Sequence, residues 1–348
     1  MRLNFTKLLV LGSVFFSLHA SAQLDPYYTH YMLNKLAYNP AVAGEKDAIC
    51  LNLITHQQWL GQRDNSRAYK PSEQGDWFDA VNPATNGFSI TAPLLNNQLG
   101  VGFQVISDKL GFNKNTYLRG SVAWKFRLGR QLPGGTGATD QTLAVGADFG
   151  MAQVQLDGTK YNPLQPGDPQ IPSTIVSGSK FDMGLGVYYT HQRLFDGFYA
   201  GLSMTHLTAP KISVAGKIDF HIERYIYFLA GSRHDFGSLA ILPSLLVKSS
   251  GKGVQVDLGA RAMLNQKLVF GANVRSADAI SLLFGYFIFP NLYVGYSYDM
   301  QAISGVRKYT AAGTHELFVS YCFDVNVGPP PPKKPIFNVR YLEGYTLY

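Results

Sequence analysis

Charged residues and cysteines are both scarce in this chain. Only 15% of the residues are charged, well below the roughly 25% of an average soluble domain. Two cysteines in 348 residues exclude a disulfide-rich scaffold. The formal charge of +7 is modest and spread along the chain, which argues against a nucleic-acid-binding protein.

Motifs for metals, cofactors and nucleotides are also missing. The chain contains no H-E-x-x-H, no C-x-x-C and no G-x-x-x-x-G-K-[ST]. Five histidines are scattered over different predicted strands: His56, His191, His206, His234 and His315. Ser203 and His206 lie three residues apart, so alternation predicts that they face opposite sides of a strand. We therefore predict no catalytic residue, no bound metal and no cofactor, and a protein that is not an enzyme.

The first 22 residues have the pattern of an export signal. Arg2 and Lys7 give a basic start, an apolar run extends from Leu8 to Leu18, and Ala20-Ser21-Ala22 supplies small residues for cleavage. A helix that crosses a bilayer needs roughly 20 apolar residues. Because this run is shorter and no later one approaches that length, we expect a signal peptide over 1–22 and no transmembrane helix.

What is abundant is glycine and aromatic residues in alternating segments. The chain has 35 Gly, 21 Tyr and 22 Phe, which fits strands with aromatic girdles at two membrane interfaces. From residue 47 to 323, apolar residues recur at every second position. In 118–128 the apolar set alternates with Arg119, Lys125 and Arg127, and such cations are tolerated in a wet lumen but not in a dry core.

The alternation predicts an all-β, antiparallel transmembrane β-barrel of about fourteen strands. Most segments are about 9–11 residues long, which is the length that a tilted strand needs. The predicted strands are 48–58, 87–93, 99–107, 116–128, 141–153, 181–191, 197–206, 223–234, 238–248, 253–263, 267–275, 279–288, 291–299 and 314–323. The barrel then spans 47–323, after an N-terminal periplasmic or plug segment at 23–46 and before a Pro-rich periplasmic tail at 324–348.

Loop lengths support a barrel with both chain ends in the periplasm. Outer-membrane barrels alternate short periplasmic turns with longer external loops. If the N-terminus is periplasmic, the first, third and later odd-numbered connections along the chain are external. Four connections are long and all of them are odd-numbered: 59–86, 156–180, 207–222 and 301–313. The even connection 129–140 is about twelve residues long and does not fit. A soluble sandwich alternates as well, but the parity favours the barrel.

The two cysteines lie near the ends of the barrel. Cys50 is near the start of the first strand and Cys322 near the end of the last, and these strands are neighbours in a closed barrel. Both fall on the lumen-facing set. A disulfide could close the barrel in an oxidising periplasm, and two unpaired residues are the alternative.

Residues 25–44 contain Asp25-Pro26, Tyr31-Met32 and Asn39-Pro40-Ala41 followed by Gly44. This run resembles the opening signature of the PorP/SprF family, outer-membrane proteins of the type IX secretion system of Bacteroidetes. Gln57-Gln58-Trp59 is similar to its Gln-Gln-Trp motif, and 88–111 to its second hairpin. The tail, with FNVRYL, looks like the SprF-type branch.

The resemblance implies a non-enzymatic role in type IX secretion or gliding. Such a barrel would dock the C-terminal domain of a large secreted or surface protein, such as an adhesin, and contact other parts of the secretion apparatus. Exposed aromatic and arginine side chains anchor interfaces. Candidates lie in the first external loop and in the tail: Arg63, Arg67, Tyr69, Trp77, Phe78, Phe337, Arg340 and Tyr341.

A general or substrate-specific porin is the main alternative. Six cations on the predicted inner face would give an anion-preferring lumen: Arg119, Lys125, Arg127, Arg261, Lys267 and Arg275. The alternating glycines Gly100, Gly102, Gly184 and Gly186 are expected to make room in that lumen. A wide, constant conductance would favour the porin, and a closed barrel the docking protein.

Overall fold

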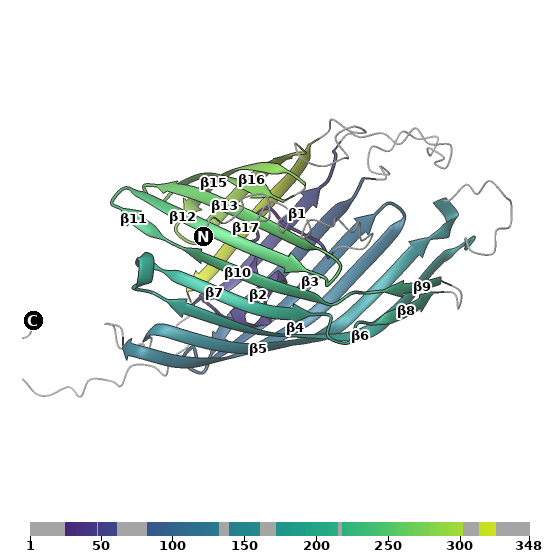
Figure 1. The fold of residues 1–348 in the computed structure, drawn as a ribbon, viewed down its shortest axis with the longest axis horizontal. Helices are drawn as coiled ribbons and strands as arrows, with labels where there is room; N and C mark the ends of the chain where they lie inside the picture. The colour runs from purple at the N-terminus through teal and green to yellow at the C-terminus, as the bar shows by residue number, and fades with distance from the viewer. Residues whose placement is uncertain are drawn as a thin grey trace, which may run out of the picture.

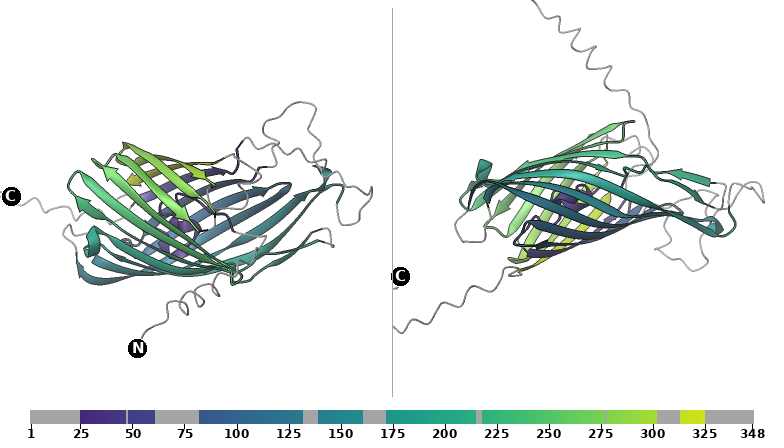
Figure 2. Two further views of the ribbon diagram at one scale, coloured as in Figure 1. Left: turned by 45° about the horizontal axis from the view of Figure 1, so that its top comes forward. Right: turned by 90° about the horizontal axis from the view of Figure 1, so that it is seen from below.

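The computed structural model describes residues 25–46, 48–60, 82–131, 139–160, 172–214, 218–276, 278–301 and 313–324. Within these ranges the fold is all-β, with a few single-turn 3₁₀ helices. The strands curl into a ring that surrounds the N-terminal segment (Figures 1 and 2). No helix in the described ranges is long and apolar enough to cross a membrane.

Fourteen strands close the barrel. The large sheet contains fifteen, of which β11 (His234–Phe236) continues the line of β10 and pairs with the start of β12. The other fourteen form a ring that closes where β10 pairs with β12. They are β1 (Ala48–Gln57), β2 (Ala84–Leu94), β3 (Leu99–Leu110), β4 (Asn113–Gln131), β5 (Thr139–Asp157), β6 (Ile175–His191), β7 (Phe198–Thr205), β10 (Tyr225–Ser232), β12 (Leu239–Ser249), β13 (Val254–Leu264), β14 (Leu268–Arg275), β15 (Ile280–Phe289), β16 (Leu292–Met300) and β17 (Thr314–Asp324).

This architecture confirms the predicted fold, while several strand lengths differ. Every neighbouring pair is antiparallel, and β1 pairs with β17. Strands β4 and β5 have 19 residues each and β6 has 17, so the connection expected at 129–140 is shorter than predicted.

The alternating faces lie as the sequence predicts. On β4, Leu118 and Trp124 are each 44% exposed, whereas Arg119 is 4% exposed. The same holds on β13, where Leu258 lies outside and Asp257 inside. Because period two fixes which side chains share a face, this pattern gives the barrel an apolar outer surface and a polar interior. Such a surface suits contact with hydrocarbon.

The two ends of the barrel differ in their connections. We call the end where β1 begins and β17 ends the proximal rim, and the opposite end the distal rim. Asn265 and Gln266, with φ of 50° and 57°, form a tight proximal turn between β13 and β14. Two central residues with positive φ match the right-handed twist of a hairpin.

A hairpin in the connection between β7 and β10 was not predicted. It consists of β8 (Lys211–Val214) and β9 (Ile218–His221), which pair only with each other in the described structure. Ile212 and Val214 are buried against Tyr117 and Val154 on the inner face of the wall. The hairpin therefore folds inward at the distal rim. Its four-residue strands are too short to produce a clear alternation in the sequence.

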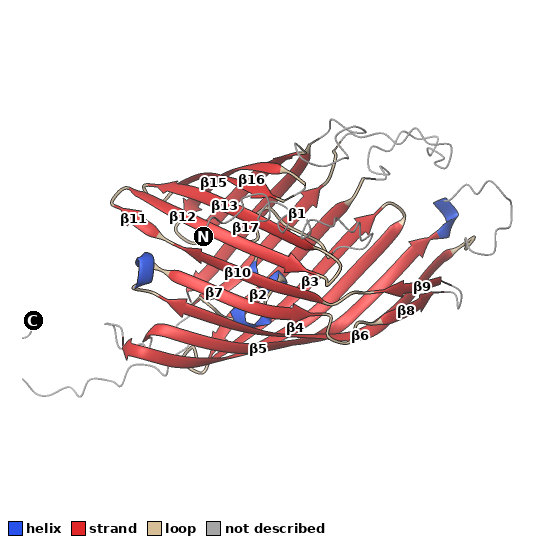
Figure 3. Cartoon of the chain, viewed as in Figure 1, coloured by secondary structure: helices blue, strands red, loops and turns tan. Residues whose placement is uncertain are grey.

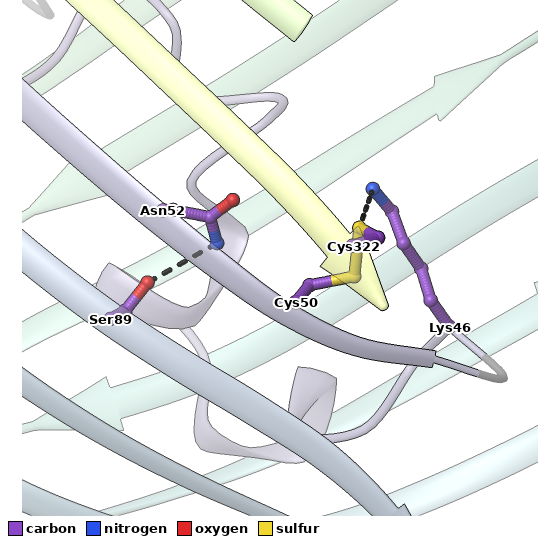
Figure 4. The surroundings of a disulfide bond; sticks show 5 residues. All are labelled: Lys46, Cys50, Asn52, Ser89 and Cys322. Carbon is purple, nitrogen blue, oxygen red and sulfur yellow. Dashed lines mark hydrogen bonds between the residues drawn. A yellow bond between two sulfur atoms is a disulfide. The ribbon is translucent and has the colours of Figure 1, made fainter. Parts of the chain in front are cut away.

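The disulfide that the sequence allows, with two unpaired cysteines as the alternative, is present in the structure. Cys50 on β1 lies directly opposite Cys322 on β17, and their sulfurs are bonded (Figure 4). The Lys46 ammonium lies 3.6 Å from the Cys322 sulfur. The bond joins the first and last strands of the barrel at the proximal rim.

Candidate functional site

The N-terminal segment fills the barrel interior. We call residues 25–46 the plug. It contains two single-turn helices, η1 (Lys35–Ala37) and η2 (Pro40–Val42), which are the blue turns inside the ring of strands in Figure 3. Tyr28, Tyr31 and Tyr38 are almost fully buried and form one cluster with side chains of the surrounding strands. The lumen is thus packed with protein along its axis.

Glycines on the inner face make room for the plug. A Cβ placed on Gly146 would lie 2.5 Å from Cα of Ala41, and one on Gly102 would lie 3.1 Å from the Leu36 side chain. A Cβ on Gly100 would come within 2.5 Å of the Ala43 carbonyl carbon. The expected role of the alternating glycines is therefore confirmed for Gly100, which accommodates the plug backbone, and for Gly102, which accommodates the Leu36 side chain.

Asn39 fixes the plug at the level of β6. Its side-chain oxygen accepts a hydrogen bond from the Ala41 N–H, and its amide donates to the carbonyl of Val187 at 2.9 Å. An asparagine that caps its own helix turn is held in one conformation. The following Pro40 begins η2, where a missing N–H costs nothing. The Asn-Pro-Ala sequence thus sets both the turn and its attachment to the wall.

Glu316, near the distal end of β17, anchors the distal half of the plug. Its carboxylate accepts hydrogen bonds from the backbone N–H groups of Thr29 and His30, at 2.8 and 2.7 Å. The imidazoles of His30 and His56 lie at 2.6 and 2.7 Å from the same carboxylate. A buried carboxylate is stable only when such donors surround it.

A second buried group centres on Arg275. Its guanidinium lies 3.3 Å from the carboxylates of Asp257 and Asp299. Asp299 also accepts a hydrogen bond from the hydroxyl of Thr29 at 2.8 Å. The plug therefore contacts the charge network of β13, β14 and β16 through Thr29. Buried ionic groups of this kind add little net stability, because the cost of removing the charges from water offsets their attraction.

Asp25 forms the distal end of the described plug. Its carboxylate lies 2.9 Å from Nε2 of His206 and accepts a hydrogen bond from the Tyr227 hydroxyl at 2.8 Å, and its backbone carbonyl accepts one from Lys248. Burial alone would raise the pKa of Asp25. The nearby charges of His206, Lys248 and Arg119 outweigh burial and hold that pKa well below its usual range.

At the proximal end, the plug is held by Glu45. Its carboxylate contacts the ammonium of Lys35 and the hydroxyl of Tyr188. Burial raises the pKa of Glu45, but the charge and hydrogen bond of Lys35 outweigh it and leave the pKa below its usual value. The carbonyl of Gly44 also accepts a hydrogen bond from Lys125 of β4.

The plug runs through the barrel from one rim to the other. Asp25 is bound to residues at the distal ends of β10 and β12, whereas Lys46 lies beside the proximal disulfide. The described chain therefore begins and ends at opposite rims, although β1 begins beside the end of β17. The prediction that both termini lie in the periplasm stays a prediction, because residues 1–24 and 325–348 are outside the described ranges.

The cations predicted to line a pore have other roles in the structure. Arg119 lies 3.9 Å from Asp182, and Arg275 is held by three aspartates. Arg261 is buried against Tyr31, Tyr199 and Tyr293 of the plug and wall. Lys267 lies exposed in a turn, outside the lumen, and Arg127 contacts the Asn96 carbonyl of another turn. These side chains therefore do not form the cation-lined, anion-preferring lumen that the porin alternative requires.

One prediction about the candidate catalytic pair is wrong. Ser203 and His206 were expected on opposite sides of a strand, yet both point into the lumen. β7 ends at Thr205, and His206 has a φ of 54°, which turns its side chain inward. Ser203 donates to the Tyr38 carbonyl, while His206 lies between Asp25 and Asp182, so the two do not form a nucleophile–base pair.

The predicted partner-binding residues lie outside the described ranges. This holds for all eight, in the first long loop and in the tail: Arg63, Arg67, Tyr69, Trp77, Phe78, Phe337, Arg340 and Tyr341. Within the described residues, no group of three or more His, Cys, Asp or Glu side chains could hold a metal ion.

The protein-family comparison decides the identity of the barrel. Residues 20–321 match the model of the "Type IX secretion system membrane protein PorP/SprF" family. The chain belongs to the PorP/SprF family. It is thus an outer-membrane β-barrel of the type IX secretion system. Comparison with curated proteins gave no match.

Solved structures of other outer-membrane barrels are similar to this PorP/SprF protein. The toluene transporter TbuX of Ralstonia pickettii is 11% identical with a TM-score of 0.47, over 82% of this chain and 92% of that chain. A FadL homologue of Pseudomonas aeruginosa is 11% identical with a TM-score of 0.45, over 87% and 95%.

Three of the plug residues that contact the wall belong to the motifs of the PorP/SprF signature. Asp25, Tyr31 and Asn39 each bind a different part of the barrel. Sequence reasoning quoted these residues for the resemblance but did not assign them a site. Two signals could have done so, namely a polar, aromatic segment without alternation and the row of inner-face glycines that makes room in the lumen.

Proposed function

We propose that this PorP/SprF protein is a closed, non-enzymatic barrel that docks the C-terminal domain of a large secreted or surface protein for export or surface retention. The observation that carries this proposal is the plug, which occupies the lumen and is bonded to strands around the ring. A diffusion channel requires an open lumen, whereas a docking protein requires a stable surface.

We further propose that the proximal rim faces the periplasm and the distal rim the exterior. Short turns at the proximal rim, such as Asn265-Gln266, fit the periplasmic side of such barrels. On this orientation 324–348 is a periplasmic tail, of the SprF type, that contacts the secretion apparatus. Residues 1–22 are, on the same proposal, a signal peptide that is cleaved during export. Deleting 328–348 should leave barrel insertion intact and impair surface display of the docked protein.

Conductance in planar bilayers tests whether the lumen is sealed. The purified wild-type protein should show little conductance, because the plug packs the lumen. A variant that lacks residues 25–46 should form a wide, stable pore if it still inserts. A wild-type protein that conducts as freely as the deletion variant would support the general porin instead.

Co-purification tests docking directly. Solubilising the outer membrane in mild detergent and isolating the tagged barrel should recover a large secreted protein with a type IX C-terminal domain. Removing that domain from the recovered protein should abolish the association. The docking proposal fails if the barrel is repeatedly isolated without such a protein from cells that display it.

A further inference from the structure

A cavity of about 180 Å³ opens at the distal rim, above the end of the plug. One water molecule needs only roughly 10–15 Å³, so the cavity can hold a long side chain. The plug supplies one of its residues, Asp25, and the inward hairpin and the residues after it supply Phe220, His221 and Glu223. Strands β3 and β4 supply Asp108, Asn113 and Tyr117.

Three carboxylates line this cavity, and one is already neutralised. Asp25 is bound by His206 and lies beside Lys248, so its charge is matched inside the barrel. The carboxylate of Asp108 accepts a hydrogen bond from the hydroxyl of Thr85, which is uncharged. Glu223 forms an exposed pair with Lys252, and exposed pairs contribute little and exchange readily. The lining is therefore acidic where Asp108 and Glu223 face it.

A buried hydrogen-bond acceptor and apolar walls complete the cavity. The side-chain oxygen of Asn113 is buried and has no hydrogen-bond partner among the described residues. An unsatisfied buried acceptor favours a ligand that brings an N–H. Phe220, Ile222 and Val154 give the walls an apolar character, which suits the methylene stem of a long cationic side chain.

We infer that this cavity binds a cationic side chain, best an arginine, of the protein that docks on the barrel. The five N–H donors of a guanidinium are enough to serve Asp108, Glu223 and the Asn113 oxygen, which line the same cavity. This inference deepens the proposed docking function and rests on it. It also places the bound side chain against Asp25, so a docked partner would touch the plug itself.

The inference is tested by measuring how tightly N-acetyl-arginine amide binds to the full-length protein in detergent. Calorimetry, or NMR of the probe, gives this affinity. N-acetyl-citrulline amide has nearly the same shape without the charge, and we expect it to bind at least fivefold more weakly. Asp108→Asn should weaken binding of the arginine probe by roughly tenfold, since a charged hydrogen-bond partner is lost. The Thr85 hydroxyl can still donate to the asparagine oxygen, which preserves the local structure.

Asp219→Asn is the control, because Asp219 lies on the hairpin that borders the cavity and pairs with Lys211, and neither residue lines the cavity. This variant should bind the arginine probe as the wild type does. Equal binding of both probes, no binding to the wild type, or an equal loss in both variants would each overturn the inference. Recovery of the secreted partner by co-purification would stand independently of that result, so failure of the cavity and failure of docking can be told apart.

Discussion

The carboxylate of Glu316, on the last strand, accepts a hydrogen bond from the backbone N–H of His30 at 2.7 Å, although 286 residues separate the two. The neighbouring N–H of Thr29 donates to the same carboxylate. One acidic side chain thus binds two consecutive amides of the plug from the strand that completes the barrel. The plug can reach this position only when β17 has joined the wall.

Replacing Glu316 with glutamine should loosen the plug without unfolding the barrel. The glutamine amide presents one acceptor oxygen where the carboxylate presents two, so a buried N–H or imidazole is left without its partner. Such a loss costs about 1.5–3 kcal/mol, or roughly a tenfold or greater rise in the population of the released plug. Trypsin cleavage after the largely buried Lys35 measures this rise.

Leu317→Ala provides the control for Glu316→Gln. Leu317 is the next residue, and it points outward with 44% exposure. Its truncation should leave cleavage after Lys35 at the wild-type rate. If both variants are cleaved equally fast, the effect reflects general weakening of β17 and not the loss of the plug anchor.

A methyl group at Gly146 should displace the plug. The added Cβ would lie 2.5 Å from Cα of Ala41, so the plug backbone must move. Overpacking of this kind costs about 1–3 kcal/mol. We expect Gly146→Ala to insert normally and to raise bilayer conductance. In Gly120→Ala the nearest atom would be 3.9 Å away, and conductance should remain that of the wild type; equal effects in the two variants would contradict the proposed role of the glycine.

The sequence predicts the wall of the barrel better than its contents. On β4, outward Leu118 and inward Arg119 follow from alternation alone, because a strand repeats every two residues. Asp25 and Glu316 are a different case. Their positions depend on a segment that folds back through the ring, and no local pattern records which strand a non-alternating segment contacts.

The same contrast explains the missed hairpin and the catalytic pair. The strands of the hairpin carry inward Ile212 and Val214, but its four-residue length is too short for period two to stand out. The orientation of His206 depends on a positive φ just beyond the end of β7, where alternation no longer applies. Cys50 and Cys322 are a contrasting case. They lie on the first and last strands, and these two strands must be neighbours when the ring closes.

Removing the disulfide should lower the stability of the barrel. Cys50 and Cys322 join strands that are 272 residues apart in the chain, and a disulfide of this kind typically contributes about 2–4 kcal/mol by restricting the unfolded chain. The Cys50→Ser, Cys322→Ser double variant should insert but unfold at a lower temperature, as followed by heat-dependent mobility in gels. Reducing agent added to the heat-unfolded wild type should prevent its return to the original mobility, and a double variant that unfolds at the wild-type temperature would contradict the stabilising role of the bond.

Acid should release the plug. The folded structure depresses the pKa of Asp25 through His206, Lys248 and Arg119, and that of Glu45 through Lys35. We call the plug seated when it lies in the lumen as in the structure, and released when it has left the lumen. A carboxyl whose pKa is lower in the seated state stabilises that state. Its stabilising contribution is complete at pH values above the ordinary pKa of the carboxyl, which is 3.8 for Asp and 4.5 for Glu. That contribution is lost as the pH falls below these values, because the released plug then takes up protons more readily than the seated one.

Bilayer conductance between pH 7 and pH 3 measures this release. The wild type should remain closed near neutral pH and open progressively as the pH falls below about 4. In Asp25→Asn the carboxylate that pairs with His206 is already absent, so the variant should leak at pH 7 and change less on acidification. A wild type and an Asp25→Asn variant with the same pH dependence would show that the plug is held by its packing against the wall and not by the charge at its distal end.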